Sequence, residues 1–97
     1  MTVTKTREGN TLTVALEGRL DTLTAPELET ELNGEEADTL VFDLAKLDYI
    51  SSAGLRLLLS SQKKANATGG TMIVRNCQPA VLDVFEVTGF MDVLTVE

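Results

Sequence analysis

The first twenty residues alternate between polar and apolar positions in a way that predicts a β-hairpin. Thr2–Arg7 is rich in threonine and has one large apolar residue, Val3, which is typical of a weak edge strand. Thr11–Glu17 places its leucines and its valine on one face and mainly polar residues on the other. Glu8-Gly9-Asn10, between the two runs, has the composition of a turn.

Three later segments have the apolar spacing and the boundary residues of helices. Before the first of them, Thr24 and Glu27 form a capping-box pattern, in which the two side chains bond free backbone N–H groups reciprocally. Gly34 and Gly89 are suitable helix stops, and Pro79 suits a first helical turn. The expected helices are Ala25–Asn33, a segment from Ser51 or Ser52 to about Ala67, and a segment from Gln78-Pro79 to Gly89.

Short apolar runs between these helices predict further strands. Thr39–Leu44 and Thr71–Arg75 are mostly apolar, which indicates strands covered on both faces, and Val93–Val96 predicts a short final strand. The resulting order is β-β-α-β-α-β-α-β. Strands separated by helices imply right-handed crossovers and a largely parallel sheet. We therefore expect an α/β domain with a mixed, mostly parallel sheet covered by helices.

The composition adds that the chain is acidic and of single-domain size. Its 97 residues are 43% hydrophobic and 24% charged, which is typical of one globular domain spanning residues 1–97. The net charge of −7 disfavours nucleic acid and anionic membrane surfaces as partners, because both attract basic proteins. No apolar run is longer than Leu57–Leu59, so we expect no insertion into a membrane.

The residue types that the chain lacks exclude several kinds of catalytic and metal-binding site. The chain has no histidine and a single cysteine, Cys77, which excludes a Ser-His-Asp triad, a Cys-His pair and a zinc cluster of these residues. Gly69-Gly70 lacks the spacing and the lysine of a phosphate-binding loop. We therefore expect a protein that is not an enzyme and needs no cofactor or metal. A lone cysteine excludes an internal disulfide and agrees with a cytoplasmic location.

Two serines, Ser51 and Ser52, stand where a buried strand is followed by a short loop and a helix. Ser52 has two interpretations: a plain N-cap, or a phosphoacceptor whose phosphate would lie at the positive end of the helix dipole. Gly54, in the first helical turn, costs a helix about 1 kcal/mol relative to alanine. It therefore indicates either tight helix–sheet packing or close approach of a partner. The acidic residues between positions 27 and 38 indicate a solvated face, or a charge that steers a basic partner.

Three segments together resemble the STAS domain family, and the similarity covers nearly the whole chain. Gly18-Arg19-Leu20-Asp21, followed by Thr24-Ala25, is similar to the family's Gly-x-Leu-Asp segment before its first helix. Asp43-Leu44 followed by Tyr49–Leu55 is similar to the phosphorylation segment, commonly Asp-Ser-Ser/Thr-Gly-Leu. Pro79 through Gly89-Phe90 is similar to the last helix and its Gly-aromatic ending.

The resemblance implies a switch protein, an anti-sigma factor antagonist. Unphosphorylated antagonists bind an anti-sigma factor, which then releases its sigma factor. The anti-sigma factor is also a serine kinase of the Bergerat ATP-binding type that inactivates the antagonist, and a metal-dependent serine phosphatase reverses this. On this chain the resemblance makes Ser52 the phosphoacceptor and puts Asp21 close to it. The partner-binding residues that it implies are Asp21, Ser51, Ser52, Gly54, Leu55 and Arg56.

Two positions depart from the family pattern. Ser51 stands where the residue before the acceptor is usually Asp, and Ala53 stands where Ser or Thr usually follows. Ser51 is therefore an alternative acceptor, and Asp21, taken without the motif, is a plain turn residue. The alternative function is that of a STAS subunit in a lipid-transporting ABC complex, which needs no phosphoserine.

Overall fold

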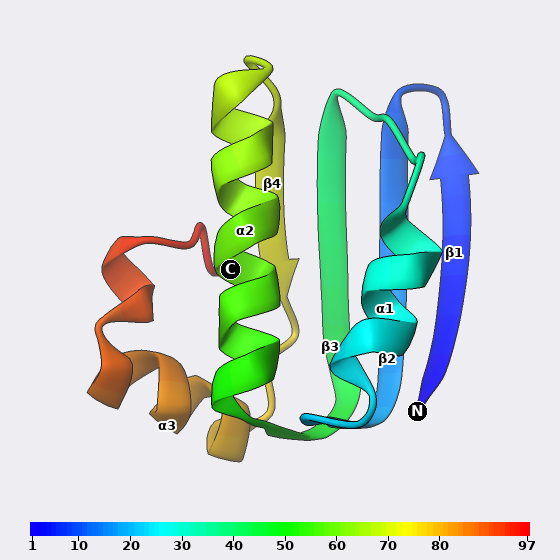
Figure 1. The fold of residues 1–97 in the computed structure, drawn as a ribbon. Coiled ribbons are helices and arrows are strands. Elements are labelled where there is room, and N and C mark those ends of the chain that lie inside the picture. The colour runs from blue at the N-terminus through cyan, green and yellow to red at the C-terminus, as the bar shows by residue number, and fades with distance from the viewer.

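The sheet has four strands in the order β1-β2-β3-β4 (Figure 1). The computed structural model describes all 97 residues. Strands β1 and β2 pair antiparallel, whereas β2, β3 and β4 pair in parallel. The predicted α/β class and the mixed, mostly parallel sheet are confirmed. The elements are β1 (Thr2–Glu8), β2 (Thr11–Leu20), α1 (Ala25–Leu32), β3 (Thr39–Ile50), α2 (Ser52–Ala67), β4 (Thr71–Arg75), α3 (Pro79–Thr88) and the 3-10 helix η1 (Phe90–Asp92).

One face of the sheet carries the core. The helices α1 and α2 lie over this face in Figure 1, because the parallel strands follow one another across the sheet and each crossover has the same hand. Strand residues such as Val14, Phe42 and Met72 form one buried cluster with helix residues such as Leu28, Leu58 and Phe85. The opposite face is rich in threonine, and its side chains are partly or fully exposed at positions 4, 6 and 13.

The three helices lie close to their predicted positions. Helix α2 covers Ser52–Ala67, and α3 is followed by Gly89 in the left-handed conformation with φ 79°. Helix α1 ends at Leu32, one residue earlier than predicted. None of the helices combines the length and the apolar character that crossing a membrane requires.

Strand β3 is longer than the sequence pattern predicted. It continues from Leu44 to Ile50, through residues that we expected to form a loop. At two points along its pairing with β2, β3 inserts one extra residue. These bulges place Leu44, Leu47 and Ile50 in the core at intervals of three, in place of the two-residue period of a regular strand. The prediction of a loop was wrong because the bulges interrupt the alternation.

The C-terminal segment forms a 3-10 turn and a single β-bridge where we expected the strand Val93–Val96. Val96 pairs in parallel with Val74 of β4, and two backbone hydrogen bonds of 2.8 Å hold this pair. Leu94 packs in the core, and its N–H donates to the Phe90 carbonyl at 2.8 Å. This turn directs the backbone away from continuous pairing, so the predicted final strand is reduced to one bridge.

An ionic cluster joins the edge strand β1 to the end of α1. Lys5 Nζ lies 3.2 Å from a Glu31 carboxylate oxygen and 3.1 Å from one of Glu35. Arg7 Nη2 lies 3.5 Å from Glu35 and donates to the Glu36 carbonyl at 2.7 Å. The hydrogen bond from Lys5 lowers the pKa of Glu35, and the bonds to Glu35 and Glu31 raise the pKa of Lys5. Part of the predicted acidic face is therefore paired with β1.

We expect Glu35→Gln to make the protein less sensitive to acid. A carboxyl whose pKa is lowered by folding stabilises the fold above its unfolded-state pKa, and this contribution is lost as the pH falls through the folded-state pKa. Thermal unfolding from about pH 7 to about pH 3 should show a smaller fall in Tm for the variant than for the wild type. The difference should shrink in high salt, because these pairs are partly exposed to solvent.

Glu36→Gln is the matched control, because only the backbone carbonyl of Glu36 takes part in the cluster. Equal acid sensitivity of Glu35→Gln and the wild-type protein would contradict this role of the Lys5–Glu35 pair.

Candidate functional site

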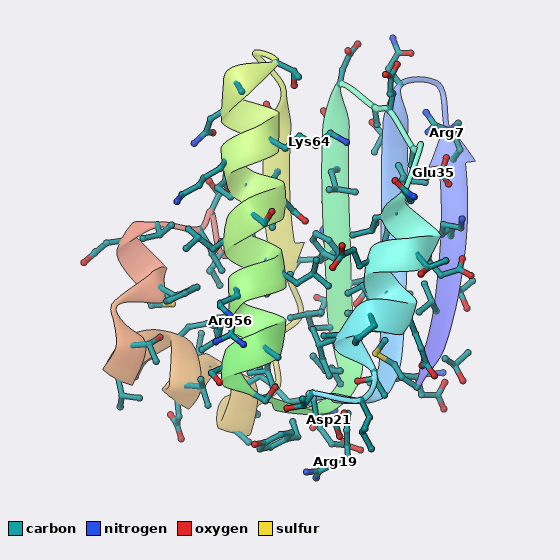
Figure 2. All side chains as sticks on the ribbon, viewed as in Figure 1. Arg7, Arg19, Asp21, Glu35, Arg56 and Lys64 are labelled. Carbon is teal, nitrogen blue, oxygen red and sulfur yellow. The ribbon has the colours of Figure 1, made fainter.

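The carboxyl ends of β2 and β3 meet at one edge of the sheet, and the candidate site is built there. Leu20 and Ile50, the last residues of these parallel strands, are partners in the register. The N–H of Ser51 donates to the Leu20 carbonyl at 2.9 Å, which holds the start of α2 beside the end of β2. Figure 2 shows Asp21 near the start of α2 and Arg56 on the first turns of this helix. The fold therefore brings together the two segments that the sequence assigned to one site.

Ser51 and Ser52 have different roles at the start of α2. Ser51 is the N-cap: its backbone is extended (φ −97°, ψ 175°), and its Oγ accepts a hydrogen bond from the Gly54 N–H at 3.4 Å. Ser52 is the first helical residue, and its side chain is exposed. The plain N-cap interpretation of Ser52 is therefore wrong, because the cap is Ser51. The Ser52 hydroxyl is left accessible from outside the molecule.

Gly54 and Leu55 lie beneath the surface. A Cβ on Gly54 would lie 2.8 Å from both Ile50 Cγ1 and Leu20 Cγ. Of the two interpretations of Gly54, the structure supports tight packing of α2 on the ends of the strands. Leu55 is 7% exposed and belongs to the core. Because Gly54 and Leu55 are buried, they would support a docking surface from below, and their place among the partner-binding residues stays a prediction.

Asp21 holds the loop between β2 and α1. Its Oδ1 accepts hydrogen bonds from the N–H groups of Leu23 at 3.0 Å and Thr24 at 3.1 Å. The bond from the Thr24 amide, above all, lowers the pKa of the Asp21 carboxyl. The predicted capping box of Thr24 and Glu27 is wrong, because the Thr24 hydroxyl donates to the Arg19 carbonyl at 2.7 Å and makes no cap bond. Asp21 is thus a turn residue that fixes the loop beside the start of α2.

The sequence pattern did not predict two exposed apolar side chains at this edge. Leu23 is 83% exposed in the loop that Asp21 holds. Tyr49, near the end of β3, is 40% exposed, and the Arg19 guanidinium lies 4.2 Å from its ring centroid. Arg19 Nε also lies 3.8 Å from Asp21 Oδ2. One feature of the sequence could have predicted that Leu23 is exposed: it lies in a turn, where a large apolar residue has no core position to occupy.

Residues 2–97 of the sequence match the family described as the STAS domain. The chain belongs to this family. It is similar to BtrV of Bordetella bronchiseptica, which is named as a candidate anti-sigma factor antagonist, with 36% identity over 101 residues that cover 99% of this chain and 85% of BtrV. It is also similar to the anti-sigma-B factor antagonist of Staphylococcus aureus, with 29% identity over 86 residues that cover 86% of this chain and 80% of that protein.

Solved structures share the fold of this STAS domain. The anti-sigma factor antagonist SpoIIAA in its unphosphorylated form matches with a TM-score of 0.83 and 20% identity, covering 99% of this chain and 88% of that chain. The phosphorylated form of SpoIIAA from Bacillus matches with a TM-score of 0.71 and 20% identity, covering 99% of this chain and 91% of that chain. The match extends along almost the whole chain, so the expected STAS fold is confirmed.

We expect Gly54→Ala to destabilise the STAS domain by about 1–2 kcal/mol. The added methyl group would lie 2.8 Å from two core side chains. This overlap outweighs the roughly 1 kcal/mol by which alanine favours a helix over glycine. Urea unfolding measures the difference, and Ser60→Ala, at an exposed position of α2, is the control that should change stability by less than about 0.5 kcal/mol. A Gly54→Ala variant as stable as the wild type would show that this contact is not tight.

Proposed function

We propose that this STAS domain is an anti-sigma factor antagonist that is switched by phosphorylation of Ser52. The observation that carries the proposal is the exposed Ser52 hydroxyl at the start of α2, which the helix cap does not use. Relatives whose names describe anti-sigma factor antagonists cover most of the chain and support the partner class. SpoIIAA, which shares the fold, has been solved both with and without phosphate, and this supports a modifiable form.

Phosphorylation would form a bond between Ser52 Oγ and the γ-phosphorus of ATP. The bond from that phosphorus to its bridging oxygen breaks, ADP leaves, and the hydroxyl proton passes to a base of the kinase. The product carries a charge of about −2 at the surface. Because Ser52 is exposed, the phosphate leaves the core unchanged and alters only what a partner meets. Repulsion and desolvation at that surface would then weaken binding, so the unphosphorylated form is the one that binds.

The proposed partner is an anti-sigma factor that is itself a serine kinase of the Bergerat type. Binding would release the sigma factor, and phosphorylation would end the interaction. A metal-dependent serine phosphatase would restore the binding form. The protein would act in the cytoplasm by binding, without catalysis of its own, and its net charge of −7 favours a protein partner over nucleic acid.

The proposed binding surface has the composition of a protein interface. Leu23 and Tyr49 are exposed apolar anchors, and charged side chains such as Arg19 and Asp21 surround them. The hydrogen bonds to Asp21 hold Leu23 in place before any partner arrives. This preorganisation lowers the entropic cost of binding. The proposed binding surface and Ser52, the proposed site of the switch, therefore lie at the same edge of the sheet.

We expect the anti-sigma kinase of the same pathway, with ATP and Mg²⁺, to add one phosphate to the wild-type protein and none to Ser52→Ala. Intact-mass spectrometry detects the gain. Ser51→Ala is the matched control: it should still be phosphorylated, although loss of the N-cap destabilises the protein by about 1 kcal/mol.

Two outcomes would overturn this assignment. A gain that survives in Ser52→Ala and disappears in Ser51→Ala would move the acceptor to the cap residue. No gain in the wild type, from a kinase that is active on another substrate, would leave a domain that binds constitutively, as a subunit of a transport complex would.

We expect Leu23→Ala to weaken binding of the unphosphorylated protein to its anti-sigma factor by about tenfold, because a large apolar anchor is truncated. Isothermal titration calorimetry measures the change in Kd. Val87→Ala is the matched control, since Val87 is 84% exposed but lies on α3. Binding of Leu23→Ala with the wild-type affinity would exclude Leu23 from the interface.

A further inference from the structure

Arg56 is an exposed cation one helical turn after Ser52. Because the two residues are four positions apart on α2, their side chains leave the same face of the helix. The ion pairs within the chain use other cations, namely Lys5, Arg7, Arg19 and Arg75. Arg56 has no carboxylate partner, and Figure 2 shows it on the first turns of α2.

The other cations are less well placed to reach Ser52. Lys63 and Lys64 are also without ion pairs, but they lie near the end of α2, about 16–18 Å along the helix from Ser52. Lys46 lies within β3, on the strand that precedes the serines. Arg19, at the end of β2, is already stacked on an aromatic ring and close to a carboxylate. Arg56 therefore combines the shortest reach along the helix with a guanidinium that no other group holds.

Resting on the proposed function, we propose that a phosphate on Ser52 is bound within the chain by the guanidinium of Arg56. An acidic group four positions before a basic one is the favourable order on a helix, because the acidic group then lies toward the positive end of the dipole. A phosphate offers three oxygens to the planar fork of the guanidinium, which suits a bidentate pair. The receptor for the modification is thus present in the unmodified protein.

This pairing would change the surface in two ways at once. Before phosphorylation, the start of α2 presents a free guanidinium at Arg56 to a partner. After phosphorylation, a group with a charge of about −2 is added, and the guanidinium is engaged with it. A partner carboxylate would lose an attractive contact and meet a repulsive one. The switch would therefore withdraw an attraction as well as add a negative charge.

The test uses the full chain made with phosphoserine incorporated at position 52, so it needs no kinase. Phosphorus NMR during a pH titration reports the second pKa of the phosphate. The charged groups of the neighbouring elements, Asp21 of the loop after β2, Glu29 of α1 and Asp48 of β3, are kept unchanged, and Arg19 of β2 is replaced only in a separate comparison. A paired guanidinium favours the dianion, so this pKa should rise by about 0.3 units or more in Arg56→Gln. Lys63→Gln is the matched control and should titrate as the wild type. Arg56→Lys keeps the positive charge, so its phosphate pKa should lie between the values of the wild type and Arg56→Gln.

Identical titration of the wild type and Arg56→Gln would overturn the proposal. A shift in Arg19→Gln with none in Arg56→Gln would overturn it as well, by assigning the phosphate to the neighbouring strand. Neither result would touch Ser52 as the acceptor, which the kinase assay decides separately. Conversely, a shift in Arg56→Gln with no kinase product at Ser52 would count against the proposed function alone.

Discussion

The packing of α2 on the ends of two parallel strands is the contact on which the rest of the structure depends. Gly54 allows the helix to approach Leu20 and Ile50 to distances that a Cβ would not permit. The hydrogen bond from the Ser51 N–H to the Leu20 carbonyl ties the helix start to β2. Together these contacts set the direction in which Ser52 leaves the surface. If α2 packed less closely on the strands, the position of Ser52 relative to the neighbouring loop would not be fixed.

The surface at this edge of the sheet is held by local hydrogen bonds, whereas the core lies between the helices and the sheet. Asp21 accepts two backbone N–H groups and so fixes the loop that carries Leu23. An exposed hydroxyl at Ser52 can be modified without repacking any buried side chain. A phosphate at this position would therefore act on affinity for a partner and leave the fold as it is. This separation suits a protein whose proposed role is to be bound in one form and released in the other.

Four of the eight lysines and arginines form ion pairs within the chain. Lys5 and Arg7 join the edge strand to α1, and Arg19 is held by Tyr49 and a carboxylate. Of the four cations without an ion pair, three are lysines, and Arg56 is the one arginine. The guanidinium of Arg56 is therefore available to pair with a phosphate on Ser52, as proposed.

The elements that could be predicted from the sequence are those whose signals are local. The alternation in β2, the glycine stops and the serines before α2 predicted the fold class, because each reflects a preference of nearby backbone. The course of β3 from Leu44 to Ile50 depends on its pairing with β2, since the bulges replace the period of two by one of three. The tertiary structure also makes Ser51 the cap and leaves Ser52 free and Leu23 exposed. These features depend on strand register and on contacts between residues far apart in the chain, which no local pattern encodes.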